Sequence, residues 1–286
     1  PVACEQAPFD GDGEIDTLLA FRTWRDFGDA KSWLASETGA TASSPFAPYL
    51  AVSDPVQQFF MLSGKTSFLG MAFEDLHRLQ VDIECFTGEG YDFCSAEREA
   101  DRIIAIAVSD QTGWSEVFSG ADMDEKALLE AFVDVVQERD PDVIEGHNLF
   151  NFDLPYIAKR AERHGVKLAL GRDGSAPRKR PSRFGAGERT IAYTRFDIYG
   201  RHVVDTLFLV QSYDVVYREL SGYGLKAVAV HFGVAAENRT YVEGDQISDV
   251  FLKEPDRLAD YVRDDVIETQ RISTLLSRSS FVQAQM

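Results

Sequence analysis

The feature that most constrains the fold is a change of hydrophobic pattern near residue 76. From there on, residues 79–84, 103–109 and 116–119 form short apolar runs, and 103–109 is a continuous one, as expected of a buried strand. These three runs can form an antiparallel meander. Amphipathic segments and further apolar runs then alternate, which predicts helices packed on a sheet.

The second part of this pattern predicts helices and parallel strands. Residues 124–138 have apolar side chains at helical spacing, and 154–164 form a helix that Gly165 can close. Between them, 143–148 predicts a strand that ends in a turn. The remaining predicted elements are a strand at 201–207 and helices at 225–232 and 258–276. We therefore expect an α/β fold, in which a mixed sheet of an antiparallel meander plus parallel strands is flanked by helices.

Residues 1–75 have a different pattern. Helical spacing extends over 15–37, and two short apolar runs at 49–52 and 58–62 predict a hairpin that turns at 53–55. This is too little for an independent core. We expect a small N-terminal appendage at 1–75 and one main domain at 76–286.

The composition is that of a soluble globular protein. Hydrophobic residues make up 44% of the chain, and no run approaches the roughly 20 apolar residues of a membrane span. The first residues form neither a basic stretch nor an apolar run, so we do not expect secretion, and Pro1 in place of a Met suggests a processed chain or part of a longer one. Cys4, Cys85 and Cys94 form no Cys-x-x-Cys pair, so we expect reduced thiols, a cytoplasmic protein and no zinc site.

The formal net charge of −18 is unusual for a nucleic-acid enzyme, because phosphate binding normally depends on a basic face. Either the acids form a solvating surface, or some gather at a metal site whose cations attract the substrate. Residues 172–201 are an exception, because basic residues there outnumber acids. Interspersed glycines and prolines predict a mobile loop, which either follows phosphates or is simply solvated.

The first candidate site is the pair Asp82 and Glu84. On a strand, side chains at i and i+2 point to the same face. Two adjacent carboxylates repel one another unless a cation neutralises them. The alternative is a solvated acidic face, but Val81 and Ile83 are apolar, which is typical of an inner strand.

Two further stretches place carboxylates at element boundaries or faces. Asn148 ends the preceding strand, and Phe152 and Asp153 open a helix, where an Asp is often only an N-cap. Tyr261 and Asp265 lie at i and i+4, on one face of the last helix. Such a pair is usually core packing plus surface charge.

Taken together, the order Asp-x-Glu, Asn-x-x-x-Phe-Asp and Tyr-x-x-x-Asp resembles the proofreading 3′→5′ exonuclease of family B DNA polymerases, the tyrosine branch of the DEDD nucleases. The string at 145–157 is similar to the family's second motif nearly throughout, and 204–206 and 221–225 are similar too. The resemblance covers about residues 76–276. Cys85 stands where many relatives have Thr, although eukaryotic replicative members also have Cys.

The resemblance implies a ribonuclease H-like fold and two Mg²⁺ or Mn²⁺ ions. Asp82 would bridge both ions, Glu84 and Asp265 would complete one site, and Asp153 would support the other. Tyr261 would orient the attacking water. A phenol with a pKa near 10 is protonated at neutral pH, so it can position a water molecule but is a poor base. These five residues are the implied catalytic set.

The resemblance also implies contacts with a single-stranded DNA 3′ end. Asn148 would touch the terminal nucleotide, and Phe152 would shape the wall of the pocket. Asp205, near the end of an apolar strand, is either an extra metal ligand or a structural residue, and we favour the structural role.

The polymerase motifs of this family, Asp-x-x-Ser-Leu-Tyr-Pro-Ser and Tyr-x-Asp-Thr-Asp, do not occur in the sequence. We expect either the proofreading part of a family B polymerase or a stand-alone relative, with 1–75 as part of a polymerase N-terminal domain. Two functions fit. One is an exonuclease on single-stranded or frayed DNA that releases nucleoside 5′-monophosphates, with an exoribonuclease as a variant. The other is a module that binds a single-stranded end, or packs against a polymerase, without useful hydrolysis.

Overall fold

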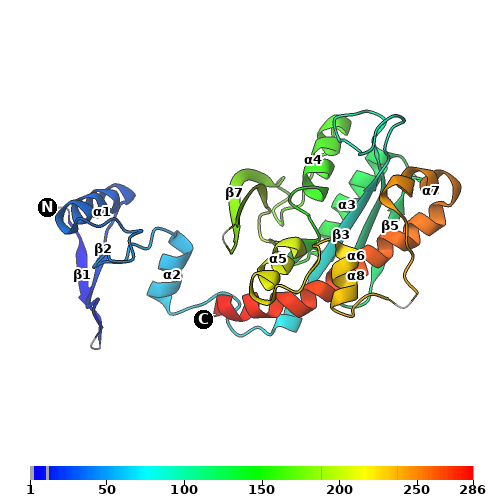
Figure 1. Ribbon diagram of the computed structural model, residues 1–286. Helices are drawn as coiled ribbons and strands as arrows, with labels where there is room; N and C mark the ends of the chain where they lie inside the picture. Colours follow the sequence, from blue (N-terminus) through cyan, green and yellow to red (C-terminus); the bar gives the residue numbers. More distant parts are fainter. Residues whose placement is uncertain (1–2, 11–12, 188, 237, 286) are drawn as a thin grey trace. The chain divides into compact units, whose positions relative to one another are not determined.

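The computed structural model describes residues 3–10, 13–187, 189–236 and 238–285, and the chain forms two compact units, Pro1–Leu69 and Gly70–Met286 (Figure 1). Pro1, which suggested a processed or longer chain, lies outside the described residues. None of the helices in the described parts of the chain combines the length and apolarity needed to span a bilayer.

The first unit contains β1 (Glu5–Pro8), β2 (Thr17–Ala20), α1 (Trp24–Thr38) and α2 (Pro55–Ser63). The two strands pair antiparallel. α1 begins after Thr23, whose hydroxyl accepts a hydrogen bond from Asp26 N, and it ends at Gly39 with a left-handed φ of 70°. The helix predicted from residue 15 therefore starts later, because 17–20 pairs as a strand.

The hairpin predicted from 49–52 and 58–62 is wrong, because the second segment is helical. Asp54 Oδ1 accepts from Val56 N at 2.7 Å and from Gln57 N at 3.0 Å, which caps α2. Pro55 occupies the first helical turn, where its missing N–H costs nothing. An Asp-Pro pair is compatible with a turn or a helix start, and here it starts a helix.

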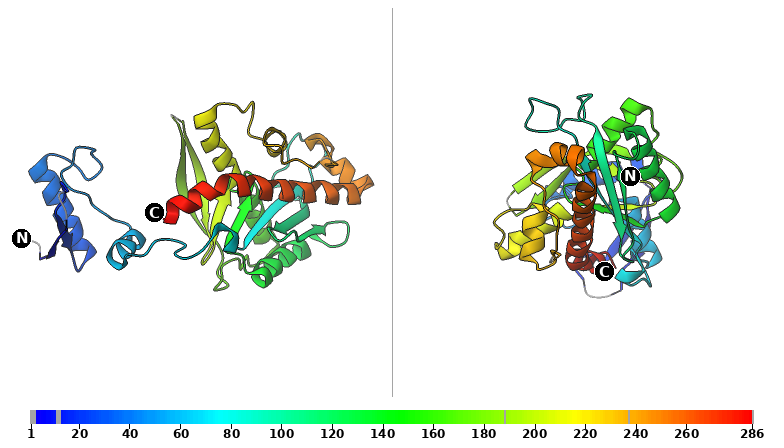
Figure 2. Two further views of the ribbon diagram at one scale, coloured as in Figure 1. Left: turned by 90° about the horizontal axis from the view of Figure 1, so that it is seen from below. Right: turned by 90° about the vertical axis from the view of Figure 1, so that its right-hand side faces the viewer.

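The second unit is built on a five-stranded mixed sheet with the order β5-β4-β3-β6-β9 (Figure 2). Its strands are β3 (Arg78–Cys85), β4 (Ile103–Asp110), β5 (Ser115–Ser119), β6 (Val143–Gly146) and β9 (His202–Asp205). The first three pair antiparallel, and β6 pairs parallel to both β3 and β9. The predicted α/β class, a meander joined to parallel strands, is confirmed.

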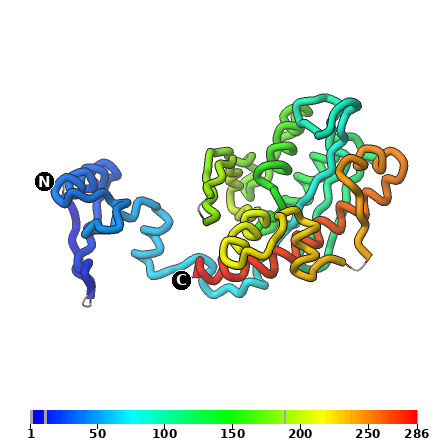
Figure 3. Tube along the Cα trace, in the orientation of Figure 1, coloured from blue at the N-terminus to red at the C-terminus, as the bar shows by residue number. Residues whose placement is uncertain are grey.

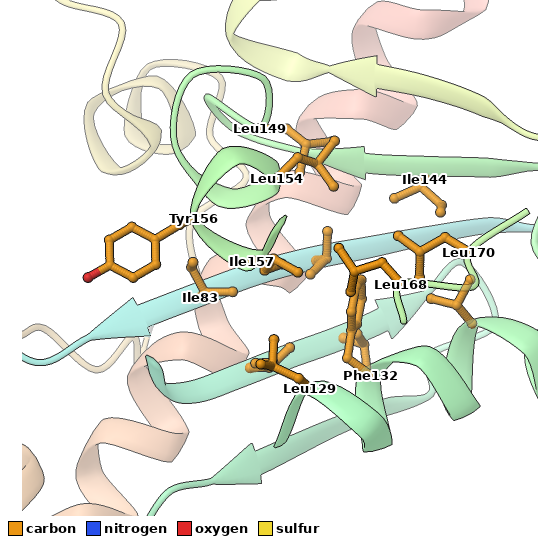
Figure 4. Close-up of a cluster of buried hydrophobic side chains, with 14 of the residues drawn as sticks. Ile83, Leu129, Phe132, Ile144, Leu149, Leu154, Tyr156, Ile157, Leu168 and Leu170 are labelled. Atoms are coloured by element: carbon orange, nitrogen blue, oxygen red, sulfur yellow. The ribbon is translucent and has the colours of Figure 1, made fainter. Parts of the chain in front are cut away.

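Helices cover both faces of this sheet. They are α3 (Glu125–Arg139), α4 (Asp153–His164), α5 (Thr206–Tyr217), α6 (Leu225–His231), α7 (Ile247–Lys253) and α8 (Pro255–Gln285). On one face, Ile83 of β3 packs in a core with Phe132 of α3 and Ile157 of α4 (Figure 4). On the other face, Ala105 of β4 shares a core with Val262 of α8. The long helix α8 therefore covers part of the second face of the sheet.

The long helix α8 runs beside the sheet (Figure 3), and a buried polar network anchors it there. Glu145 of β6 accepts hydrogen bonds from Ser273 Oγ and from Gln80 Nε2, both at 2.7 Å. Arg78 Nη2 donates to Thr274 Oγ1 at 2.8 Å. An unpaired buried polar group destabilises the folded state, and a shift of α8 would unpair several of these groups. The network therefore allows one position of α8 relative to β3 and β6. The position of α8 in turn determines where its acidic residues lie.

The prediction of a mobile loop at 172–201 is wrong for most of this segment, which forms two paired strands. β7 (Arg178–Ala186) and β8 (Arg189–Asp197) form an antiparallel hairpin. Phe184 of β7 stacks on Phe208 of α5 with ring centroids 4.4 Å apart. Prolines and glycines suggested a loop, but aromatic packing against α5 orders the segment.

Arg160 ties α4 to the segment between β3 and β4. It is 2% exposed, and it donates to Glu125 from Nε at 2.7 Å and to the Arg98 carbonyl from Nη1 at 2.8 Å. We predict that Arg160→Met lowers the free energy of unfolding by about 3–5 kcal/mol, because the buried Glu125 loses its arginine partner. Arg163→Met, which breaks an exposed pair on the same helix, should cost at most about 1 kcal/mol. Urea denaturation measures both, and equal losses would contradict the prediction.

Candidate active site

Three carboxylates from two distant parts of the chain meet in the second unit. Asp82 and Glu84 come from β3 and Asp265 from α8, and one oxygen of each lies within 4.8 Å of the others. They lie at a cavity of about 430 Å³. The cavity is lined by Asp82, Ile83, Glu84, His147, Phe152, Asp153, Gly224, Leu225, Lys226, Ala227, Tyr261 and Asp265.

Strand and helix periodicity place these groups together. Asp82 and Glu84 are half-buried on the α8 side of β3, while Ile83 between them points into the opposite core. Tyr261 and Asp265 are one turn apart in α8, and both are buried, with 6% and 5% of their surface exposed. One face of a strand therefore meets one face of a helix.

Asp153 lies beside this cluster, although it is not one of the three oxygens in close contact. It is the first residue of α4, and the N-cap position belongs to Phe152, which makes no side-chain cap. Asp153 Oδ1 instead accepts from Ile83 N at 3.3 Å, so its carboxylate faces β3. The alternative that Asp153 only caps the helix is therefore wrong.

The turn before α4 depends on Gly146 and Asp205. A Cβ on Gly146 would lie 2.8 Å from Leu149 Cδ1, too close for any larger residue without a shift. Asn148 adopts a left-handed φ of 70°. The Asp205 carboxylate accepts from Asn148 N at 2.8 Å and from Phe150 N at 3.0 Å, which holds this turn. These bonds give Asp205 the structural role that we favoured over metal binding.

Phe152 and Asn148 were both expected to contact the nucleotide. The structure places Phe152 in the lining of the cavity but not Asn148. Phe152 lines the cavity and packs on Tyr156 with ring centroids 5.5 Å apart. Asn148 is half-buried, its Oδ1 accepts from Asn151 Nδ2 at 3.2 Å, and it is not among the described residues that line the cavity. The cavity therefore brings together six of the seven predicted site residues.

Burial and mutual repulsion raise the pKa values of the clustered carboxyls. Asp82 and Glu84 have pKa values well above the usual range, first because their carboxyl groups are shielded from water and next because of the charge of Asp265. Burial, with neighbouring carboxylates, raises the pKa of Asp153 to about 8. Burial also raises the pKa of Asp265, although the charge of Arg239 opposes the rise. Without further positive charge, the cluster therefore keeps protons at neutral pH.

The donor set suits a hard divalent cation. Carboxylate oxygens are the ligands that Mg²⁺ and Mn²⁺ prefer, and no thiolate or imidazole belongs to the close group found among the described residues. A cation between these oxygens would remove the repulsion that raises their pKa values. The fold thus holds together acids that only a cation can leave fully ionised.

Arg239 is a site residue that the sequence analysis missed. Its buried guanidinium forms an ion pair with Asp265 through Nη2, and its Nε donates to Glu268 at 3.0 Å. The guanidinium also lies 5.7 Å from the ring centroid of Tyr261. Arg239 lies in a segment without hydrophobic periodicity, so no local signal marked it. The spacing of Asp265 and Glu268, two acids one turn apart in α8, is the signal that could have indicated a nearby cation.

Comparison with known proteins gives consistent similarities. The sequence pattern of the exonuclease domain of DNA polymerase family B matches residues 65–228. A DNA polymerase of Pyrococcus glycovorans is 34% identical over 172 residues, and one of Thermococcus litoralis is 40% identical over 120 residues. The solved family B DNA polymerase of the hyperthermophilic archaeon Pyrobaculum calidifontis superposes with a TM-score of 0.67 at 23% identity, a likeness of fold alone.

The chain spans only part of each of these polymerases. The Pyrococcus alignment covers 55% of this chain and 21% of the polymerase, and the Thermococcus alignment covers 39% and 7%. The structural match covers 96% of this chain and 37% of the Pyrobaculum polymerase.

The raised pKa of Asp153 predicts a pH-dependent stability of the metal-free protein. The folded state keeps this proton up to pH about 8, whereas the unfolded state releases it near the ordinary value of 3.8. Stability relative to Asp153→Asn should therefore fall as the pH rises from 4 to 8 and then level off. Melting temperatures in EDTA, measured across this range for both proteins, test this. A difference that is independent of pH would contradict it.

Asp205 offers a test of the turn. Asp205→Ala should lower the free energy of unfolding by at least about 2 kcal/mol, because the buried amides of Asn148 and Phe150 lose their acceptor. It should also weaken Mn²⁺ binding, since the turn positions Asp153. Asp134→Ala, on the exposed side of α3, should change stability by less than about 0.5 kcal/mol. Denaturation and calorimetric titration measure the two effects, and unaltered Mn²⁺ binding by the Asp205 variant would count against the turn's role.

Proposed function

Because the chain belongs to the exonuclease-domain family of family B DNA polymerases, we propose that it is a metal-dependent 3′→5′ exonuclease. It removes nucleoside 5′-monophosphates from the 3′ end of single-stranded or frayed DNA. The observation that carries the proposal is the convergence of Asp82, Glu84 and Asp265 at one cavity, with Asp153 and Tyr261 in its lining.

The four carboxylates are the residues that would hold two Mg²⁺ or Mn²⁺ ions. Asp82, Glu84 and Asp265 would hold one ion, and Asp153 together with Asp82 would hold the other. When bound, such ions make a water more acidic and stabilise the charge on the leaving oxygen. Ionised carboxylates are needed for this, so binding is coupled to the release of the protons that the metal-free cluster keeps.

Tyr261 positions the attacking water. Burial and the nearby carboxylates raise the pKa of its phenol, so the hydroxyl stays protonated at neutral pH. A protonated phenol can donate one hydrogen bond and accept another, which orients a water without removing its proton. Phe152 forms the apolar part of the cavity wall against which the terminal nucleotide packs, and Asn148 contacts that nucleotide from the adjoining turn.

Arg239 keeps Asp265 in place. Its guanidinium bonds Asp265 and Glu268 and lies over the ring of Tyr261, so two catalytic side chains of α8 share one buried cation. The fixed geometry of a guanidinium suits this role better than the flexible ammonium of a lysine.

We place the activity within residues 76–286 and propose that residues 1–75 belong to the N-terminal domain of a polymerase. The proofreading activity would then act with a polymerase domain of the same full-length chain. A stand-alone relative of the family would use the same site. Neither arrangement alters the chemistry of the cavity.

Digestion of a 5′-labelled oligonucleotide with Mg²⁺ or Mn²⁺ tests the proposal. The wild type should shorten it stepwise from the 3′ end, and Asp82→Ala should reduce the rate more than about 100-fold, since even outer partners of metal ligands cost about 10–100-fold. Asp260→Ala, an exposed acid one residue before Tyr261, should retain activity. An inert wild type, or an active Asp82→Ala, would rule the proposal out.

Two further arms separate the alternatives. Digestion of matched DNA and RNA strands compares the substrates directly, and faster loss of RNA would favour an exoribonuclease. Calorimetric titration with Mn²⁺ should show saturable binding that depends on Asp82 and Asp265. Strand binding without such metal binding would favour a module that only holds a single-stranded end.

A further inference from the structure

Lys226 is the one lysine or arginine among the described residues that line the cavity. It lies in the first turn of α6, next to Gly224 and Leu225, which also line it. The other ionisable groups of the lining are Asp82, Glu84, Asp153, Tyr261, Asp265 and His147. His147 is engaged on both ring nitrogens, with Thr206 Oγ1 at 2.9 Å and with the Tyr223 carbonyl at 2.7 Å. A single ammonium thus faces a cavity dominated by acids.

The ammonium of Lys226 has a defined position. Its Nζ donates to the Val242 carbonyl at 2.9 Å and lies 4.5 Å from the ring centroid of Tyr261. The charge reaches the carboxyl cluster, because it opposes the rise in pKa of both Glu84 and Asp265. An ammonium has three N–H donors, so the bond to Val242 leaves capacity for a further acceptor.

Arg239 and Lys226 differ in how their charge is used. Arg239 bonds two carboxylates directly. Lys226 forms no ion pair within 4.0 Å of a carboxylate in the described parts of the chain. Its charge is held at the cavity wall by a neutral carbonyl and an aromatic ring. A cation held in this way can bind an anion that enters the cavity without first breaking a salt bridge.

We propose that Lys226 binds a phosphate of the DNA end and places it beside the hydroxyl of Tyr261. This rests on the proposed function, because it names the group that receives the terminal phosphodiester in the same cavity. A cavity whose fixed charges are mainly negative repels phosphates unless cations offset them. Lys226 is a cation of the chain itself, and it acts both as a phosphate ligand and as a positioning residue for Tyr261.

Salt dependence of binding tests the contact without any need for hydrolysis. The probe is a 5′-fluorescein oligothymidylate in Ca²⁺, with its length checked on a gel and its binding followed by anisotropy. Lys226→Ala should weaken binding and reduce the slope of log K against log salt by about 0.7, the value for one phosphate contact on a single strand. Lys226→Arg should restore the slope. The control is Lys126→Ala, which removes an exposed ammonium paired with Glu130 and should leave the slope unchanged.

Replacing the terminal phosphodiester with a neutral methylphosphonate locates the contact. The wild type should lose about 10-fold or more in affinity, the effect of one hydrogen bond to a charged group, while Lys226→Ala should lose much less. Equal losses, or an unchanged salt slope for Lys226→Ala, would show that Lys226 only offsets the acids and would overturn the inference. If the wild type digests DNA normally in that case, the proposed function still stands. If the wild type neither binds nor digests DNA, both are wrong.

Discussion

Mutual repulsion between carboxylates held in one cavity is the constraint on which this site depends. Asp82, Glu84 and Asp265 bring oxygens within 4.8 Å of one another, and burial raises the pKa of each. When ionised, such a cluster costs stability unless cations neutralise it. The surrounding structure must therefore hold the acids in place, because their own repulsion opposes this arrangement.

Buried polar contacts away from the cavity provide this restraint. Glu145 and its partners lock α8 along the sheet, Asp205 holds the turn that leads to Asp153, and Arg239 orients Asp265. Each contact joins segments that are far apart in the sequence. Because unpaired buried polar groups cost about 1–3 kcal/mol each, such contacts allow one arrangement and exclude small shifts. A site that must place two strand acids opposite a helix acid needs this precision.

The distribution of positive charge matters to the proposed function, in which an acidic chain would act on a polyanion. The net charge is −18, yet the cavity has Arg239 behind its acids and Lys226 at its wall. The arginines of the β7–β8 hairpin are partly neutralised, since Arg180 and Arg195 both bond Asp197. These cations therefore pair with nearby groups of the chain, and in the proposed function bound metal would supply the rest of the attraction for phosphate.

Much of this could be predicted from the sequence, because strand and helix periodicities are local. The family and the mixed sheet are confirmed, and the pairing of Asp82 with Glu84 on one face and of Tyr261 with Asp265 on another follows from spacings of two and four residues. The sequence by itself thus determined which side chains share a face. Tertiary structure alone decided that these faces meet, that Arg239 pairs with Asp265 and that the Arg-rich segment pairs as a hairpin. Such contacts depend on charge and packing between segments that come together only when the chain folds, and no local pattern records them.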